Sequence, residues 1–266
     1  MESTLPTLLK RLTDPSISDS RVISWSSPVP AFGDVTRSRV ATLGLNPSNR
    51  EFVDTAGKEL SGDNRRFHTL SSLGIPCWSQ AESAHCDQIV ESCRAYFTRN
   101  PYDSWFRQLD HIIAGTDSSY YDEASQACHL DLIPYATACK WTDLSRIQKE
   151  RLLAVVGDTL GQILRDSPIR LLVLNGRSVV EQFQDMAGLE LKRREMAGWT
   201  LKRHGRPVVT GYSYVGTVHS LAGIEFGRAI QILGFNHNLQ SSFGVTKEVR
   251  GSIRRWIARA SKEAAA

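Results

Sequence analysis

The segment 40–52, with the sequence VATLGLNPSNREF, takes a short apolar run into a sharp polar turn. The run at 40–45 predicts a buried strand, and Gly44 with Asn46-Pro47 predicts a turn at its C-terminal end. In open α/β folds, ligands bind at the carboxyl ends of the strands. The side-chain carbonyl of Asn46 could hold a water molecule there, although an amide is too weak a base to take a proton from it.

Three further polar elements are predicted at strand ends: residues 129–135 (HLDLIPY), the turn Asn175-Gly176, and residues 215–223 (VGTVHSLAG). A histidine such as His219 could donate a hydrogen bond to a departing group as negative charge develops on it. Asp131 lies between two leucines of a predicted strand, so its carboxylate needs a partner. The structural alternatives are a turn residue at Asn46, a core histidine at His219 and a carboxylate at Asp131 that only stabilises the fold.

The order and spacing of these elements across about residues 40–235 resemble the uracil-DNA glycosylase superfamily, most closely its Gly-x-Asn-Pro members. Residues 64–67 (NRRF) are similar to an Asn-Arg-Phe stretch that follows the first motif in mismatch-specific members. The usual His-Pro-Ser loop is replaced by residues 219–221 (HSL), which lack the proline. The resemblance implies a monofunctional DNA glycosylase that flips out a base and hydrolyses its N-glycosidic bond. An abasic site would remain, and neither a metal nor another cofactor would be needed.

In this resemblance Asn46 and His219 are the catalytic residues, and Asp131 stands where uracil-processing members commonly carry an asparagine. A carboxylate would repel O4 of uracil and accept from the exocyclic amino group of cytosine. If burial protonated it, Asp131 could also donate to N3 of cytosine. We therefore expect a modified cytosine, such as glucosylated hydroxymethylcytosine, as the target. This is compatible with a phage-defence branch of the superfamily.

The remaining candidates line a substrate pocket or contact DNA. Phe52, and after it Phe67 and Tyr135, could stack on the base, although aromatic residues at such places commonly belong to the core. Leu221 could fill the gap left by a flipped base, or be the first apolar residue of a following helix. Glu51 and Asp54 could orient water or bind a sugar hydroxyl. The other predicted substrate contacts are Gly44 and Pro47, and the predicted DNA contacts are Ser48, Arg50, Arg177, Lys202, Arg203, Ser220 and Leu221.

Three other functions remain open. The enzyme could remove uracil, thymine or another deaminated base in DNA repair, which Asn46 allows and Asp131 opposes. The chain could be a non-catalytic module for single-stranded or damaged DNA, which would form no abasic site. It could also hydrolyse small nucleosides or nucleotides, which would not require the basic clusters.

Composition is that of a globular protein, with 41% hydrophobic and 23% charged residues among 266. No apolar run approaches the roughly 20 residues of a membrane span, and the N-terminus lacks a signal-peptide pattern, so we expect a cytoplasmic protein without membrane contact. A monomer is what the resemblance implies. The five cysteines include no Cys-x-x-Cys pair, which argues against a zinc ribbon or a disulfide framework. The net charge of +4 is concentrated in residues 192–206 and 247–262, which suits a DNA partner.

These residues need a framework of strands alternating with helices, which predicts a parallel sheet. Four strands are expected at 40–45, 128–133, 170–175 and 207–218. Helices are expected at 80–98, 103–114 (capped by Asp103), 144–165 (capped by Asp143), 177–187, 221–234 and 246–261. The fold class is therefore α/β, a single domain at 40–266 with a central four-stranded parallel sheet flanked by helices. Residues 1–39 are expected to form an N-terminal helix and an arm packed on the body.

Overall fold

A six-stranded mixed sheet runs through the part of the chain described by the computed structural model, which covers residues 4–202, 207–240 and 245–263. Its strand order is β2-β1-β3-β6-β5-β4. The strands are β1 (Val40–Gly44), β2 (Ala127–Asp131), β3 (Leu171–Asn175), β4 (Lys192–Glu195), β5 (Tyr212–Leu221) and β6 (Ile224–Phe235). The α/β class is confirmed, and the expected first three strands are present.

The direction of the fourth expected strand was wrong. Strand β5, which covers much of residues 207–218, runs antiparallel to its neighbours β6 and β4. The strand beside β3 is instead β6, which is parallel to it. The expected four-stranded parallel sheet is therefore replaced by a mixed sheet of six strands.

The expected helix at 221–234 was also wrong, because this segment forms β6. Strands β5 and β6 are joined by the two residues Ala222 and Gly223, both with positive φ (49° and 79°). Two such residues suit a tight hairpin whose twist matches that of its strands. Gly223 can adopt this conformation without a steric penalty, but Ala222 is an unusual residue for it. The sequence therefore gives only a weak hairpin signal.

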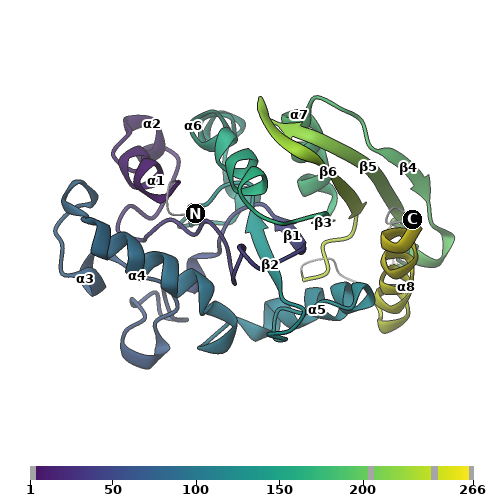
Figure 1. Cartoon of the computed structure of the whole chain (residues 1–266), viewed down its shortest axis with the longest axis horizontal. Coiled ribbons are helices and arrows are strands. Elements are labelled where there is room, and N and C mark those ends of the chain that lie inside the picture. The colour runs from purple at the N-terminus through teal and green to yellow at the C-terminus, as the bar shows by residue number, and fades with distance from the viewer. Residues whose placement is uncertain (1–3, 203–206, 241–244, 264–266) are drawn as a thin grey trace.

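Helices cover both faces of the sheet (Figure 1). Helices α6 (Arg146–Arg165) and α7 (Arg177–Ala187) contact β5 and β6 on one side. On the other side, α8 (Lys247–Glu263) contacts β6 and packs against α5 (Asp103–Ile113). The described chain also contains α1 (Leu5–Arg11), α2 (Pro15–Ser18), α3 (Leu70–Leu73) and α4 (Ser83–Arg94).

Most predicted helices are confirmed, but their caps differ from the prediction. Ser145, rather than Asp143, caps α6, because its hydroxyl accepts from the Gln148 backbone N–H. Asp103 is the first residue of α5 and follows the cap position at Tyr102. The helix expected at 80–98 is shorter, and ends before a 3₁₀ turn at Tyr96–Thr98.

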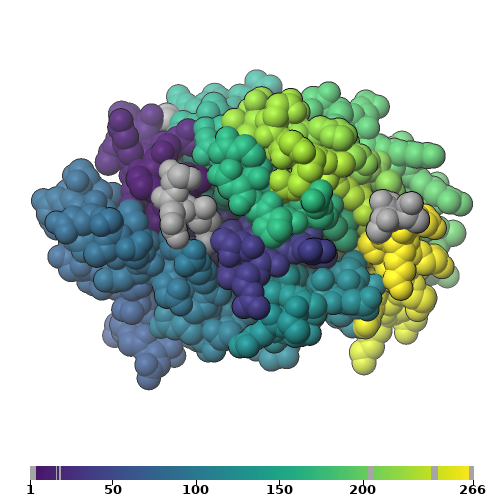
Figure 2. Space-filling model, viewed as in Figure 1, coloured from purple at the N-terminus to yellow at the C-terminus, as the bar shows by residue number. Residues whose placement is uncertain are grey.

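The N-terminal arm covers the free edge of β2. Phe32 and His129 exchange both backbone hydrogen bonds, each of 2.9 Å, and the Val29 N–H donates to the Pro134 carbonyl. Helix α1 buries Leu5 and Leu8 against the same side of the molecule as α6. In Figure 2, the N-terminal helices and α8 lie on opposite sides of the visible face. No helix in the described residues is both long and apolar enough to cross a membrane.

Candidate active site

A row of polar side chains lies on one face of β1 and β2, at the carboxyl end of both strands. Successive strand residues point to opposite faces, so Thr42 and Gly44 share a face, as do His129 and Asp131. The parallel register pairs Thr42 with His129 and Gly44 with Asp131. All four residues are buried, and the exposed fraction of Asp131 is 8%.

Gly44 gives the space that the Asp131 carboxylate occupies. A Cβ atom at this position would lie 2.4 Å from Asp131 Oδ1 and 3.0 Å from His129 Nε2. The predicted role of Gly44 in a turn is therefore better described as close packing, because the residue ends β1 beside the neighbouring strand. Asp131 has the partner that its burial requires, since His129 Nε2 lies 3.4 Å from Asp131 Oδ1.

Asn46 is half-buried and held in one orientation by its amide nitrogen. Nδ2 donates to the Pro47 carbonyl at 3.1 Å, to Thr137 Oγ1 at 3.0 Å and, more weakly, to the Tyr135 carbonyl at 3.4 Å. Because all three partners accept hydrogen bonds, they distinguish Nδ2 of the amide from Oδ1. Thr137 itself donates to the Cys139 carbonyl, so its oxygen is free to accept from Asn46. This arrangement directs Oδ1 away from these anchors as an acceptor.

Glu51 is a second buried carboxyl group and interacts electrostatically with Asp131. Burial raises the pKa of Glu51 to about 7. A hydrogen bond from Tyr96 Oη at 2.8 Å and the nearby Arg66 guanidinium act in the opposite direction, and the Asp131 charge adds to the increase. A carboxyl group with this pKa can gain or lose a proton near neutral pH. The sequence suggested Glu51 only as a carboxylate near the loop.

Arg66 connects Glu51 to the surrounding loops. Its Nε lies 3.8 Å from Glu51 Oε2, and its guanidinium donates to the carbonyls of Arg50 and Asn100. It also lies over the ring of Tyr102, 5.6 Å from its centroid. The 64–67 segment therefore contributes Arg66 to the site.

The three predicted stacking residues are core residues in this structure, so this prediction was wrong. Phe52 and Phe67 are each 1% exposed and pack against one another at 5.8 Å between ring centroids. Phe67 stacks on Tyr96 at 5.1 Å. Tyr135 is also 1% exposed, and its hydroxyl donates to the Leu8 carbonyl at 2.7 Å. Each aromatic face is covered by the protein.

His219 lies at the opposite end of the sheet from Asn46, so the predicted catalytic pair is not brought together. In the sheet, Leu174 of β3 lies beside Gly234 of β6, which pairs with Tyr214 of β5. His219 follows Tyr214 by five residues along β5. At the usual rise per strand residue, the two residues are about 17 Å apart. Because β5 is antiparallel, this distance leads toward the amino ends of β1 and β3.

Ser220 and Leu221 follow His219 to that far end. Ser220 pairs with Glu225 in the hairpin, and Leu221 is 1% exposed. The Leu221 carbonyl lies against Gly161 of α6, 2.6 Å from where a Cβ would stand there. A buried leucine cannot act as an exposed wedge, so the prediction for Leu221 was wrong, whereas the half-buried Ser220 remains a predicted DNA contact.

The loop after β6 occupies the carboxyl edge, where we had expected residues 215–223. Leu239 N–H donates to Asn175 Oδ1 at 3.4 Å, and Asn175 Nδ2 donates to Gln240 Oε1 at 2.9 Å. His237 is buried, and its Nε2 lies 2.6 Å from the Trp199 carbonyl. This loop could not be predicted from the sequence, because the residues of the preceding strand, β6, also fit a helical pattern.

The predicted DNA contacts are scattered. Ser48 and Arg177 are exposed near the carboxyl edge, where Ser48 accepts from the Arg50 N–H and Arg177 donates to Glu181 at 2.6 Å. Arg50 is half-buried and donates to the Asp54 carbonyl. Lys202 is exposed, and Arg203 lies outside the described residues. Pro47 is buried beside Asn46.

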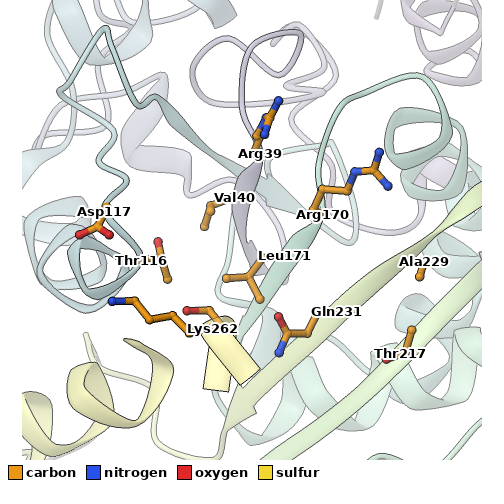
Figure 3. Close-up of a pocket in the computed structure, with 11 residues that line it drawn as sticks. Arg39, Val40, Thr116, Asp117, Arg170, Leu171, Thr217, Ala229, Gln231 and Lys262 are labelled. Carbon is orange, nitrogen blue, oxygen red and sulfur yellow. The ribbon is translucent and has the colours of Figure 1, made fainter. Parts of the chain in front are cut away.

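A cavity of about 540 Å³ lies at the amino edge of the sheet. In Figure 3, Lys262 extends toward Thr116 and Asp117, whereas the side chains of Arg39 and Arg170 turn away from this group. The cavity lies beside the first residues of β1 and β3, far from Asn46. It is thus separate from the row of polar residues at the carboxyl edge.

The carboxyl-edge arrangement combines two buried carboxyl groups, an oriented amide and an arginine within an α/β fold. Comparison of the chain with protein-family models and with curated proteins found no match.

Replacing Gly44 by alanine should force Asp131 and His129 to move. We expect the Gly44→Ala protein to lose about 1–3 kcal/mol in free energy of unfolding, the usual range for overpacking a core. Urea unfolding measures the change. The matched control is Gly157→Ala in α6, where a Cβ meets no atom within 4 Å and helix propensity favours alanine. Equal stability of the two variants would contradict the close packing at Gly44.

Glu51 should make the protein less stable as the pH rises from about 4.5 to 7. The folded protein keeps the Glu51 proton up to about pH 7, whereas the unfolded chain loses it near the ordinary value of 4.5. Glu51→Gln removes this difference, so its stability relative to the wild type should rise by about 3 kcal/mol across that interval. Urea unfolding between pH 4 and 8 tests this. If the free energies of unfolding of the wild type and of Glu51→Gln changed in parallel across this pH range, the raised pKa of Glu51 would be contradicted.

Proposed function

We propose that this protein is a DNA glycosylase that flips out a base and hydrolyses its N-glycosidic bond, leaving an abasic site. The observation that carries the proposal is that Glu51 and Asp131 are buried close enough to interact electrostatically, with the oriented amide of Asn46 in the loop that follows β1. Glycosidic hydrolysis needs a water molecule held at the sugar, a group to accept its proton and contacts to the departing base. These three residue types can meet those needs without a metal or another cofactor.

In the proposed mechanism, Asn46 Oδ1 orients the attacking water and Glu51 takes its proton. The C1′–O bond forms as the bond from C1′ to the base nitrogen breaks, and the electron pair of that bond leaves with the base. Glu51 is suited to this role because its pKa of about 7 places it near the optimum for a general base at neutral pH. Tyr96 and Arg66 stabilise the ionised form of Glu51.

Asp131 is proposed to read the base. Its carboxylate accepts hydrogen bonds, which suits the amino group of a cytosine and disfavours the O4 carbonyl of uracil. A modified cytosine, such as glucosylated hydroxymethylcytosine, therefore remains the proposed target, with anti-phage defence as the proposed role. Exposed Arg177 and the exposed basic strand β4 are suited to the phosphate backbone.

Glu51→Gln should reduce base release by about 10²–10⁴-fold, the usual contribution of a general base. Release is measured by mass spectrometry from DNAs that contain uracil, cytosine, 5-hydroxymethylcytosine or glucosylated hydroxymethylcytosine. Wild-type release should increase as the pH rises through about 7, because Glu51 acts in its ionised form. Glu51→Gln should not show this increase in base release with pH.

His219→Ala is the matched control, since His219 is exposed at the far end of the sheet and should not affect release. Release of uracil alone would favour a repair glycosylase and contradict the role given to Asp131. Tight DNA binding without release from any substrate would contradict the enzyme and favour a binding module. Full activity of Glu51→Gln would contradict the proposed mechanism.

A further inference from the structure

A continuous row of buried polar side chains leads from the protein interior to Asp131. Tyr120 Oη lies 2.5 Å from Thr42 Oγ1, and Thr42 Oγ1 lies 2.6 Å from His129 Nδ1. On the other side of the ring, His129 Nε2 faces Asp131 Oδ1 at 3.4 Å. Tyr120, Thr42 and His129 are each no more than 1% exposed, so protein groups determine how their protons are arranged.

The direction of these hydrogen bonds follows from Tyr120. Burial raises the pKa of its phenol well above the ordinary value, so the phenol keeps its proton. Its ring stacks on Phe97 at 4.6 Å and meets the edge of Phe106, and among the described residues Thr42 is the hydrogen-bond partner of the hydroxyl. Donation by Thr42 toward Tyr120 would leave the phenol proton buried among aromatic rings, which is costly. Tyr120 therefore donates to Thr42.

The direction continues through Thr42 to the histidine. A threonine hydroxyl has one proton, and an oxygen that accepts from Tyr120 is free to donate that proton to His129 Nδ1. A neutral imidazole that accepts at Nδ1 carries its proton on Nε2. This Nε2–H points toward Asp131, which must accept from it. The opposite tautomer would bring an Nε2 lone pair against the carboxylate oxygen.

We propose that Tyr120, Thr42 and His129 are positioning residues that keep Asp131 a hydrogen-bond acceptor, so that the site selects bases with an exocyclic amino group over bases with a carbonyl there. This inference rests on the proposed function, because it assigns the specificity of the same site. Asp131 Oδ1 faces His129 Nε2, and in this proposal the other carboxylate oxygen accepts from the base. The row thus extends the determinants of specificity to residues that touch no substrate.

The tautomer of His129 is measured directly by long-range ¹H–¹⁵N correlation spectra of the imidazole rings, assigned with a His129→Gln variant. We expect the Nε2–H form in the wild type and in Thr42→Ser, which keeps the hydroxyl. Thr42→Val keeps the shape of the side chain but removes the donor to Nδ1, and should populate the Nδ1–H form. A wild-type Nδ1–H form, or an unchanged tautomer in Thr42→Val, would overturn the proposal. Thermal unfolding verifies that each variant is folded.

Selectivity is measured with DNAs that contain 5-hydroxymethylcytosine or 5-hydroxymethyluracil, which differ in the amino or carbonyl group at position 4. The ratio of their release rates should fall by about tenfold in Thr42→Val and in Tyr120→Phe, and stay near the wild-type value in Thr42→Ser. An altered tautomer with an unchanged ratio would overturn the link to specificity. No release from any DNA by the wild type would overturn the proposed function and the selectivity with it, while the spectra still test the hydrogen-bond row separately.

Discussion

Two carboxyl groups, Glu51 and Asp131, are buried close enough to influence one another, and the surrounding structure depends on accommodating both. Neighbouring like charges in a protein interior are costly, so such a pair favours a shared proton between its members. Here the environments differ: Glu51 faces the phenol of Tyr96 and the nearby guanidinium of Arg66, whereas Asp131 faces the imidazole of His129. Burial raises the pKa of Glu51 to about 7 and the Asp131 charge adds to the increase, whereas the phenol of Tyr96 and the guanidinium of Arg66 act in the opposite direction. Glu51 can therefore gain or lose a proton near neutral pH.

The sheet register makes this pair possible. Had β2 slipped by one residue, apolar side chains (Leu130 with either Cys128 or Leu132) would replace His129 and Asp131 on the face that Thr42 shares. Gly44 is required at the same level because the carboxylate lies against its Cα. A cluster of aromatic residues, including Phe32, Phe67 and Phe106, packs behind this row and excludes water. The alternation of side chains along each strand, the pairing of β1 with β2 and the packing of the core therefore all determine the positions of Thr42, His129 and Asp131.

Much of the framework was predictable from the sequence. Apolar runs located β1, β2 and β3, and helical periodicity located α5, α6, α7 and α8. The failure at β6 has a physical reason. Buried Phe226, Ile230 and Leu233 recur at the i, i+4, i+7 spacing of a helix, whereas the even spacing of buried Phe226, Ile230 and Ile232 fits a strand. The Ala222-Gly223 turn is a weak signal. That one error placed His219 at the wrong edge of the sheet. Long-range contacts such as Tyr96 with Glu51 lie 45 residues apart and could not be inferred from local patterns.

The two edge strands of the sheet, β2 and β4, are protected from pairing with further strands in different ways. The edge of β2 is covered by the arm, through the backbone bonds between Phe32 and His129. Strand β4, at the other edge, consists of Lys192, Arg193, Arg194 and Glu195, all exposed, and Arg193 lies over the ring of Tyr212. Charged edge strands discourage pairing with the sheet of another molecule. The basic strand therefore protects the protein from edge-to-edge aggregation, whatever it binds.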